Sequence, residues 1–262
     1  MEKKIKVLVG TPCYDGKLDV YFVDSLLNTL SISEERNVGI YPLFVCYDSL
    51  VQRARNDIFK VAYESKMDMV IFIDSDVGWK PEDFYKLVFS NKDLIGGSYR
   101  KKTDDSEIYA VKALEEIDKT LNLNVDNDGL LQVAGLGCGF LKLSRNCIET
   151  MWNVSKEYTS DKGVSKMVFE VVCEDDSIIS EDIYFCKKWI GLGNSVYLDT
   201  HITCVHSGTK LFKGDMNNWI NNLINIRNHP INIESSISMP KDKLSEYFKT
   251  KSDDDEEFKV LV

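Results

Sequence analysis

One short segment constrains the fold more than any other: residues 69–73 read MVIFI and stop abruptly at Asp74. Five consecutive apolar residues suit a β-strand with both faces covered, because side chains alternate between the two faces of a sheet. Covering both faces requires helices on each side, and sheets covered in this way are mostly parallel. The segment therefore predicts an α/β fold.

The first two-thirds of the chain repeats this alternation of apolar runs and helical patterns. The expected strands are residues 5–9, 40–46, 69–73 and 94–95, and the expected helices are residues 20–30, 50–63 and 81–89. Strands separated by helices indicate right-handed crossovers. We therefore expect a Rossmann-like, mostly parallel central sheet that is flanked by helices.

The remainder of the chain is less regular. It predicts a helix at 180–190, two late strands at 196–198 and 202–205, and a last helix at 215–227. The acidic run at 253–257 is expected to be solvated. We expect one domain over residues 1–213, followed by a helical extension and acidic tail over residues 214–262.

Charge and hydropathy exclude several classes of protein. Of the 262 residues, 32 are Lys or Arg and 42 are Asp or Glu, so the net charge is −10. This balance argues against a nucleic-acid polymer as partner, because such a partner needs a basic face. No stretch approaches the ~20 apolar residues of a membrane span, and the first apolar run is too short for a signal peptide.

The seven cysteines are scattered and form no C-x-x-C pair. An odd, scattered set indicates reduced, buried thiols and not a disulfide framework or a zinc site. We therefore expect a cytoplasmic protein in a reducing compartment.

The acids of Asp74-Ser75-Asp76 directly follow the apolar run. Open α/β folds bind ligands at the carboxyl edge of the sheet, and two carboxylates there suit a hard divalent cation that keeps positions open for substrate phosphates. The alternative is a solvated loop whose acids cap the next helix. The position after a buried strand, where acids have no packing role, favours a site for Mn²⁺ or Mg²⁺.

Two expected helices carry further polar residues. Arg53 and Asn56 are three residues apart and share one helix face, which suits a base or a phosphate. Glu181 and Asp182 follow the expected cap Ser180, where the helix dipole keeps a carboxylate ionised, as a general base requires. Ordinary solvated or capping roles are the alternatives for both sets.

The end of the second late strand carries His206, one of only three histidines. A neutral imidazole nitrogen there could ligate a metal, although a lone histidine more often has a structural role. Lys210 and Lys213 follow and could neutralise phosphate. Glycine-rich segments at 96–97 and 135–139 suit close approach of a ligand, but neither matches a phosphate-loop or dinucleotide pattern.

Taken in order, these segments resemble a GT-A-fold glycosyltransferase of the nucleotide-sugar-dependent, metal-using kind, above all the small family-2-like and viral or phage-type enzymes. The resemblance spans roughly residues 5–210 and includes a D-x-D motif at 74–76 and an x-E-D motif at 180–182. D-x-D alone is common by chance, whereas the ordered set is considerably more specific. No Q-x-x-R-W motif follows, so a processive polysaccharide synthase is not expected. A viral or phage origin is a further expectation.

The resemblance implies a role for each motif. Asp76, His206 and Asp74 would hold the cation, and Asp182 would be the base, or Glu181 if the helix start is shifted. The residues that would bind the nucleotide sugar are Thr11, Pro12, Cys13, Tyr14, Asp48, Arg53, Arg55, Asn56, Asp74, Ser75, Lys210 and Lys213. The sugar and acceptor pocket would include Gly97, Arg100, Gly137 and Gly139.

The implied function is metal-dependent transfer of a sugar from a UDP or GDP sugar to a hydroxyl of a glycan, protein or small molecule. Inversion of the anomeric configuration is expected, and retention is left open. The sequence does not identify the donor sugar or the acceptor, because specificity depends on the shape of the pocket and a few hydrogen bonds. One alternative is a dehalogenase-like phosphatase, which expects Thr or Val where Gly78 stands. A sugar nucleotidyltransferase would open with a basic phosphate loop that residues 10–16 lack. A non-catalytic sugar-nucleotide or glycan-binding protein does not need the intact acids.

Overall fold

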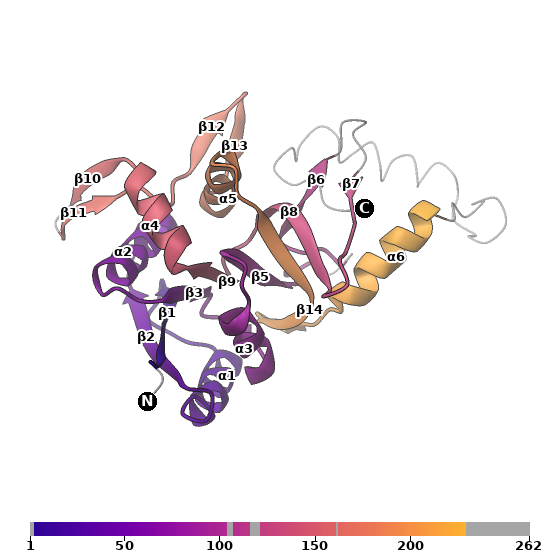
Figure 1. The fold of residues 1–262 in the computed structure, drawn as a ribbon, viewed down its shortest axis with the longest axis horizontal. Coiled ribbons are helices and arrows are strands. Elements are labelled where there is room, and N and C mark those ends of the chain that lie inside the picture. Colours follow the sequence, from indigo (N-terminus) through magenta and orange to yellow (C-terminus); the bar gives the residue numbers. More distant parts are fainter. Residues whose placement is uncertain (1–2, 104–106, 116–120, 161, 229–262) are drawn as a thin grey trace.

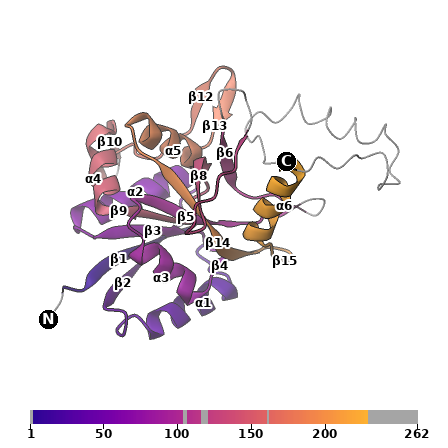
Figure 2. The same ribbon diagram turned by 45° about the vertical axis from the view of Figure 1, so that its right-hand side comes forward.

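The structure is a computed structural model that describes residues 3–103, 107–115, 121–160 and 162–228. An eleven-stranded sheet runs through the molecule, with helices on both of its faces (Figures 1 and 2). Along the sheet the strands follow the order β2-β1-β3-β9-β5-β14-β8-β6-β7, while β4 and β15 both pair with β14. The α/β fold class expected from the sequence is confirmed.

The elements have the following bounds. The strands of the sheet are β1 (Ile5–Cys13), β2 (Val38–Cys46), β3 (Met69–Ile73), β4 (Val77–Gly78), β5 (Leu94–Tyr99), β6 (Val111–Glu115), β7 (Leu121–Asn122), β8 (Leu130–Leu136), β9 (Phe140–Ser144), β14 (Val196–Ser207) and β15 (Leu211–Phe212). The helices are α1 (Val20–Ser31), α2 (Val51–Glu64), α3 (Pro81–Phe89), α4 (Arg145–Val154), α5 (Glu181–Gly191) and α6 (Met216–Asn228). Two hairpins are separate from the sheet: β10 (Glu157–Ser160) with β11 (Gly163–Lys166), and β12 (Val172–Glu174) with β13 (Ser177–Ile179).

Strand direction brings several strand ends to one edge of the sheet. Strands β2, β1 and β3 pair in parallel, and so do β5 and β14. Strand β9 lies antiparallel between β3 and β5, so β5 runs in the same direction as β3. The five parallel strands therefore end at one edge, where β9 begins. Strands β8, β6 and β7 extend the sheet with antiparallel pairs.

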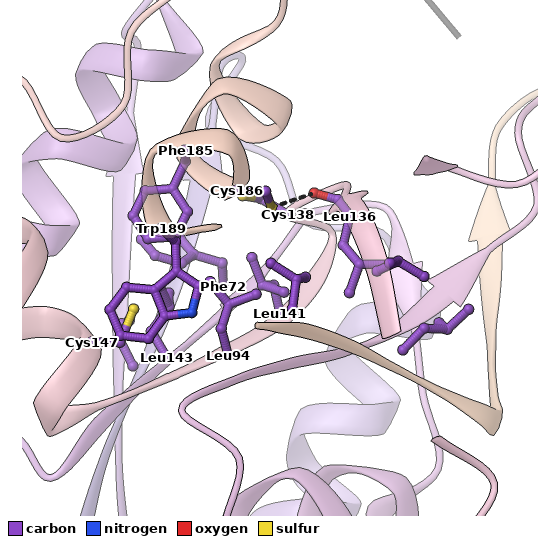
Figure 3. Close-up of a cluster of buried hydrophobic side chains, with 14 of the residues drawn as sticks. Phe72, Leu94, Leu136, Cys138, Leu141, Leu143, Cys147, Phe185, Cys186 and Trp189 are labelled. Carbon is purple, nitrogen blue, oxygen red and sulfur yellow. Dashed lines mark hydrogen bonds between the residues drawn. The ribbon is translucent and has the colours of Figure 1, made fainter. Parts of the chain in front are cut away.

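The apolar strand β3 is buried on both faces, as its sequence predicts. Val70 and Phe72 pack into the cluster that includes side chains of α2, α4 and α5, whereas Ile71 and Ile73 pack into the cluster that includes α1 and α3. This split follows from the alternation of side chains along a strand. Figure 3 shows the first cluster, in which Phe185 and Trp189 of α5 pack against the sheet. This packing fixes the position of the first turn of α5.

Three expectations about strands are corrected. Strand β5 runs to Tyr99 and does not end at residue 95. Strand β1 extends beyond residue 9, because residues 10–13 pair with the end of β2 up to Cys13 opposite Cys46. The two late strands are one strand, β14, whose pairing with β5 is irregular between Leu198 and Thr203. The polar residues between them stay within the strand because Thr200 donates both its N–H and its hydroxyl to the Gly129 carbonyl.

The last helix, α6, confirms the helix expected at 215–227. The acidic run at 253–257 lies outside the described residues, and the boundary at residue 213 stays a prediction. None of the helices in the described part of the chain is long and apolar enough to cross a membrane. All seven cysteines are free; Cys46 and Cys173 are exposed and the other five are buried.

Candidate functional site

The candidate site lies at the edge where the parallel strands end. The loop of residues 74–76 follows β3, Asp48 follows β2, Arg100 follows β5, and His206 lies at the end of β14. A hydrogen bond of 3.2 Å from the Asp74 N–H to the Gly139 carbonyl joins this loop to the start of β9. Segments far apart in the sequence thus meet at one sheet edge, which is the usual ligand position in open α/β folds.

The loop of residues 74–76 is held by its backbone. The Asp19 N–H donates to the Ser75 carbonyl (2.9 Å), and the Ser207 N–H donates to the Asp76 carbonyl (2.8 Å). The Ser207 hydroxyl donates in turn to the Asp19 carboxylate (2.6 Å). Because backbone bonds fix the loop, the carboxylates of Asp74 and Asp76 remain available for other partners. Asp19 also caps α1, a role that the sequence could have predicted, unlike its bond to Ser207.

Asp76 lies beside His206 because β4 pairs with β14, which places Val77 opposite His206. Nε2 of His206 is 3.6 Å from Oδ1 of Asp76, and the Lys102 ammonium is 2.5 Å from Oδ2. We call these three residues the outer acid cluster. Burial acts to raise the pKa of Asp76, but the contacts with His206 and Lys102 outweigh it and hold that pKa below its usual value.

The orientation of the His206 ring is suited to binding a cation. Nδ1 lies 2.9 Å from the carbonyl oxygen of Arg100, which can only accept a hydrogen bond, so Nδ1 carries the proton. Nε2 faces the Asp76 carboxylate at 3.6 Å, and in a neutral ring it would offer a lone pair there. A cation between Nε2 and the carboxylate would bind both, and a ring N–H bond to a backbone carbonyl is typical of metal-ligating histidines.

The protein alone would supply an incomplete set of ligands. Within the described residues, no three His, Cys, Asp or Glu side chains are arranged to hold a metal. Mg²⁺ commonly binds through one or two carboxylates and completes its coordination with water and substrate phosphates. The donor set of Asp76 and His206 therefore fits a cation that is shared with a bound diphosphate.

Asp74 has a different partner. The Arg55 guanidinium is only 5% exposed and forms ion pairs with Glu181 and, at 3.1 Å, with Asp74. We call Arg55, Asp74 and Glu181 the buried ion cluster. Burial raises the pKa of Glu181, and the charge of Arg55 opposes this rise. The structure thus brings together two of the three expected cation ligands and pairs the third with a buried arginine.

Asp182 is half-buried in the first turn of α5 and has one carboxylate oxygen in use. Its Oδ1 accepts from the Ser180 hydroxyl (2.6 Å) and from the Ile183 N–H (2.8 Å). The Ser180 hydroxyl therefore orients the acid and does not cap the helix, contrary to expectation. Oδ2 has no hydrogen-bond partner among the described residues, so it can accept a proton from a substrate. Glu181, by contrast, is committed to Arg55.

Tyr99, at the end of β5, was not identified from the sequence. Its ring meets that of His206 edge to face at 4.9 Å between centroids. Burial raises its pKa well above the ordinary value, and the charges of Asp74 and Asp182 add to the rise. The side chain is only 9% exposed, and its hydroxyl has no hydrogen bond to any described residue. Tyr99 therefore packs against His206 of the outer acid cluster and keeps its hydroxyl protonated.

The glycines expected in the sugar and acceptor pocket have a packing role instead. A Cβ atom on Gly137 or Gly139 would lie 2.6 Å or 2.3 Å from atoms of Tyr99. A Cβ on Gly97 would lie 2.1 Å from the Ile202 side chain. The space beside each glycine is therefore filled by the protein itself. Their absent side chains make room for Tyr99 and for the core, and the expected approach of a ligand to these glycines stays a prediction.

The expected nucleotide-binding residues of β1 are mostly buried. Thr11 and Cys13 lie inside the strand, and burial raises the pKa of the Cys13 thiol to about 12. Pro12 is half-buried. Tyr14 follows the strand and is 71% exposed. Of this group, Tyr14 has the side chain most accessible to a nucleotide.

The expected nucleotide-binding residues of α2 divide into two groups. Arg53 donates to the Asp48 carboxylate at 2.7 Å, and this bond lowers the pKa of Asp48 at the end of β2. Asn56 is buried, and its amide both donates to and accepts from the backbone of Phe169. Asn56 therefore anchors the segment before β12, which corrects its expected contact with the nucleotide. The sequence gives no indication of Phe169 as its partner.

The remaining basic residues surround the turn between β14 and β15. Lys210 is exposed in that turn, with its ammonium 5.4 Å from the centre of the Phe212 ring. Lys213 is exposed just beyond β15, and its carbonyl accepts from Arg100 at 3.5 Å. The guanidinium of Arg100 also reaches the Thr103 carbonyl. The structure thus places these cations near the end of β14, which carries His206.

Comparisons with known proteins bear on the fold alone. No protein-family model matches the sequence, and no curated protein sequence matches it. Among solved structures, A197 from STIV is similar over 80% of this chain and 93% of that chain, with a TM-score of 0.51 and 18% identity. A glycosyltransferase involved in the glycosylation of the major capsid of PBCV-1 aligns over 57% of this chain and 66% of its own, with 10% identity and a TM-score of 0.30. HddC from Yersinia pseudotuberculosis aligns over 56% of this chain and 79% of its own, with 12% identity and a TM-score of 0.30. The similarity to A197 therefore establishes a shared fold.

Proposed function

We propose that this chain is a metal-dependent glycosyltransferase. It would move a sugar from a UDP or GDP sugar to a hydroxyl of a glycan, protein or small molecule, with inversion at the anomeric carbon. The observation that carries the proposal is the orientation of His206, whose Nδ1 lies against the Arg100 carbonyl and whose Nε2 faces the Asp76 carboxylate. This pair, at the edge where the five parallel strands end, suits a cation that is shared with a diphosphate.

The residues around this pair would bind the donor. Asp76 and His206 hold the cation from the protein side, and exposed Lys210 and Lys213 add positive charge for the phosphates. A divalent cation bound there, Mn²⁺ or Mg²⁺, would neutralise the diphosphate and stabilise it as leaving group. The nucleoside would lie toward the ends of β1 and β2, where Tyr14 is exposed.

Asp182 is the proposed base. Ser180 and the Ile183 N–H hold its Oδ1, so Oδ2 can take the proton of the acceptor hydroxyl as that oxygen attacks the anomeric carbon. A positioned base of this kind contributes roughly 10²- to 10⁴-fold to a rate. The Tyr99 hydroxyl, kept protonated by burial, would donate a hydrogen bond to a substrate oxygen between the base and the cation.

The test is release of nucleoside diphosphate from a panel of UDP and GDP sugars, with Mn²⁺, with Mg²⁺ and with a chelator. Water can serve as acceptor, so the natural acceptor is not needed. We expect release that depends on the cation and is lost in Asp76→Asn and His206→Gln. Asp68→Asn is the matched control, because Asp68 precedes β3 at the opposite edge of the sheet and bonds the Lys6 N–H.

Two other outcomes would replace the proposal. Tight donor binding without release under any condition would indicate a sugar-nucleotide-binding protein. Formation of a nucleotide sugar from a nucleoside triphosphate and a sugar phosphate would indicate a nucleotidyltransferase. Full release by Asp76→Asn in the presence of chelator would remove the role of the cation.

A further inference from the structure

Lys102 is a member of the outer acid cluster, and the proposed function gives it no role. It lies just beyond β5, and its ammonium contacts Oδ2 of Asp76, the oxygen that does not face His206. The Lys102 side chain is 35% exposed and that of Asp76 37% exposed. The pair is therefore partly solvated, unlike the pair of Arg55 with Glu181, whose side chains are 5% and 10% exposed.

The stem of Lys102 rests in a groove that a glycine provides. A Cβ atom on Gly208 would lie 3.1 Å from Cδ and 3.4 Å from Cε of Lys102. The absent side chain at Gly208 thus lets the four-carbon stem cross the turn after β14 and reach Asp76. The atoms that face Gly208 belong to the stem alone, and the ammonium at its end contacts Asp76.

A lysine ammonium and a divalent cation compete for one carboxylate. Both carry positive charge, so the two repel one another at the few ångströms that a shared ligand would impose. Without a divalent cation, Lys102 supplies positive charge to the Asp76 carboxylate. With the cation bound, the ammonium must leave, and phosphate oxygens are suitable new partners for it.

We propose that Lys102 is an internal counter-ion of Asp76, which a divalent cation displaces and which then pairs with the diphosphate of the donor. The inference rests on the proposed function, because it takes Asp76 as a cation ligand. Its consequence is coupled binding. Displacement weakens cation binding to the free protein, and the diphosphate offsets this cost by accepting the released ammonium, so that each ligand favours the other.

The experiment is calorimetric titration of the full-length chain with Mn²⁺, alone and with saturating UDP or GDP. For Lys102→Met we expect the Kd for Mn²⁺ alone to fall about two- to fivefold, the range that a partly exposed ion pair supports. The further gain in affinity from the nucleotide should be smaller in this variant than in the wild type. Lys86→Met is the matched control, because Lys86 pairs with Asp83 on α3 and should change neither value.

A second variant tests the same idea without removing the charge. Gly208→Ala places a methyl group against the Lys102 stem and should also tighten Mn²⁺ binding. Unchanged or weaker Mn²⁺ binding in both variants, with wild-type binding intact, would overturn the counter-ion role and leave the proposed function standing. If the wild type binds no Mn²⁺ even with UDP or GDP, the proposed metal dependence fails instead.

Discussion

The two acids of the loop at 74–76 have opposite surroundings although only one residue separates them. Asp74 belongs to the buried ion cluster, where Arg55 is almost fully buried and joins α2, β3 and α5. Asp76 belongs to the outer acid cluster, where a partly solvated lysine and a histidine face it. A buried arginine cannot leave its partners without a large cost, whereas an exposed lysine can. The comparison indicates that Asp74 holds the scaffold together and that Asp76 is available for a ligand.

The largest expected effect concerns Asp182, which is next to a member of the buried ion cluster but keeps one oxygen free. Asp182→Asn should lower turnover by about 10²- to 10⁴-fold, because the proton acceptor is lost, and should leave donor binding intact. The measurements are nucleoside diphosphate release and donor titration. Asp176→Asn, at the exposed tip of the β12–β13 hairpin, is the control. Wild-type turnover by Asp182→Asn would reassign the base.

The next largest effect is a difference in the stability of the protein between a variant of the buried ion cluster and a variant of the outer acid cluster. Arg55→Met leaves Asp74 and Glu181 as unpaired carboxylates, which should lower the free energy of unfolding by about 3–5 kcal/mol. Lys102→Met breaks a partly solvated pair and should cost no more than about 1 kcal/mol. Urea denaturation measures both values. A double variant, Arg55→Met with Glu181→Gln, should recover part of the loss. Equal losses in the two single variants would contradict the distinction between the clusters.

The two clusters should also differ in the sign of their pH dependence. The pKa of Asp76 is lowered in the fold, so its contribution to stability is present above the unfolded pKa of ~3.9 and is lost as the pH falls through the folded value. The pKa of Glu181 is raised, so the native state binds the proton more tightly than the unfolded state does. The contribution of Glu181 to stability therefore falls as the pH rises from ~4.3 through the folded pKa of this group.

Urea denaturation between about pH 3 and 7 tests these signs over the range that the two reference pKa values define. The stability difference between the wild type and Asp76→Asn should grow as the pH rises from the acid end. The difference between the wild type and Glu181→Gln should instead shrink. If the two stability differences changed with pH in the same direction, the surroundings of Asp76 and Glu181 would be alike, which would contradict this prediction.

The smallest expected effect compares two buried tyrosine hydroxyls. Tyr99→Phe removes a hydroxyl that has no partner among the described residues, so stability should hold while kcat/KM falls about two- to tenfold through a lost substrate hydrogen bond. Tyr85→Phe removes a hydroxyl that donates to the Thr29 carbonyl at 2.9 Å, so stability should fall by about 1 kcal/mol with activity unchanged. A stability loss in Tyr99→Phe without a kinetic effect would make Tyr99 purely structural.

Much of the fold could be predicted from local patterns. The helix at Pro81 and the strand MVIFI have their expected bounds, because proline and an unbroken apolar run are local signals. The position of Asp76 at a sheet edge followed from the same strand. The irregular strand β14 was predicted as two strands, because its interruption at 199–201 is satisfied by Gly129, which lies 71 positions before Thr200.

Partners in the site could not be predicted, because they depend on contacts between distant segments. Arg55 and Asn56 are neighbours on α2, yet the fold turns one toward Glu181 and the other toward Phe169. Similarly, glycines 137 and 139 suggested an open approach to a ligand, and the space beside them holds Tyr99. Only the packed structure distinguishes a glycine that admits a ligand from one that admits another side chain.

The central claim is that Asp76 and His206 hold a divalent cation that serves a nucleotide-sugar donor. The most direct measurement is nucleoside diphosphate release from UDP and GDP sugars by the wild type and Asp76→Asn, each with Mn²⁺ and with a chelator. The account predicts release by only one of these four combinations, the wild type with Mn²⁺. It predicts no release by the wild type with chelator, and none by Asp76→Asn with either addition. Release that is the same in all four conditions would contradict it.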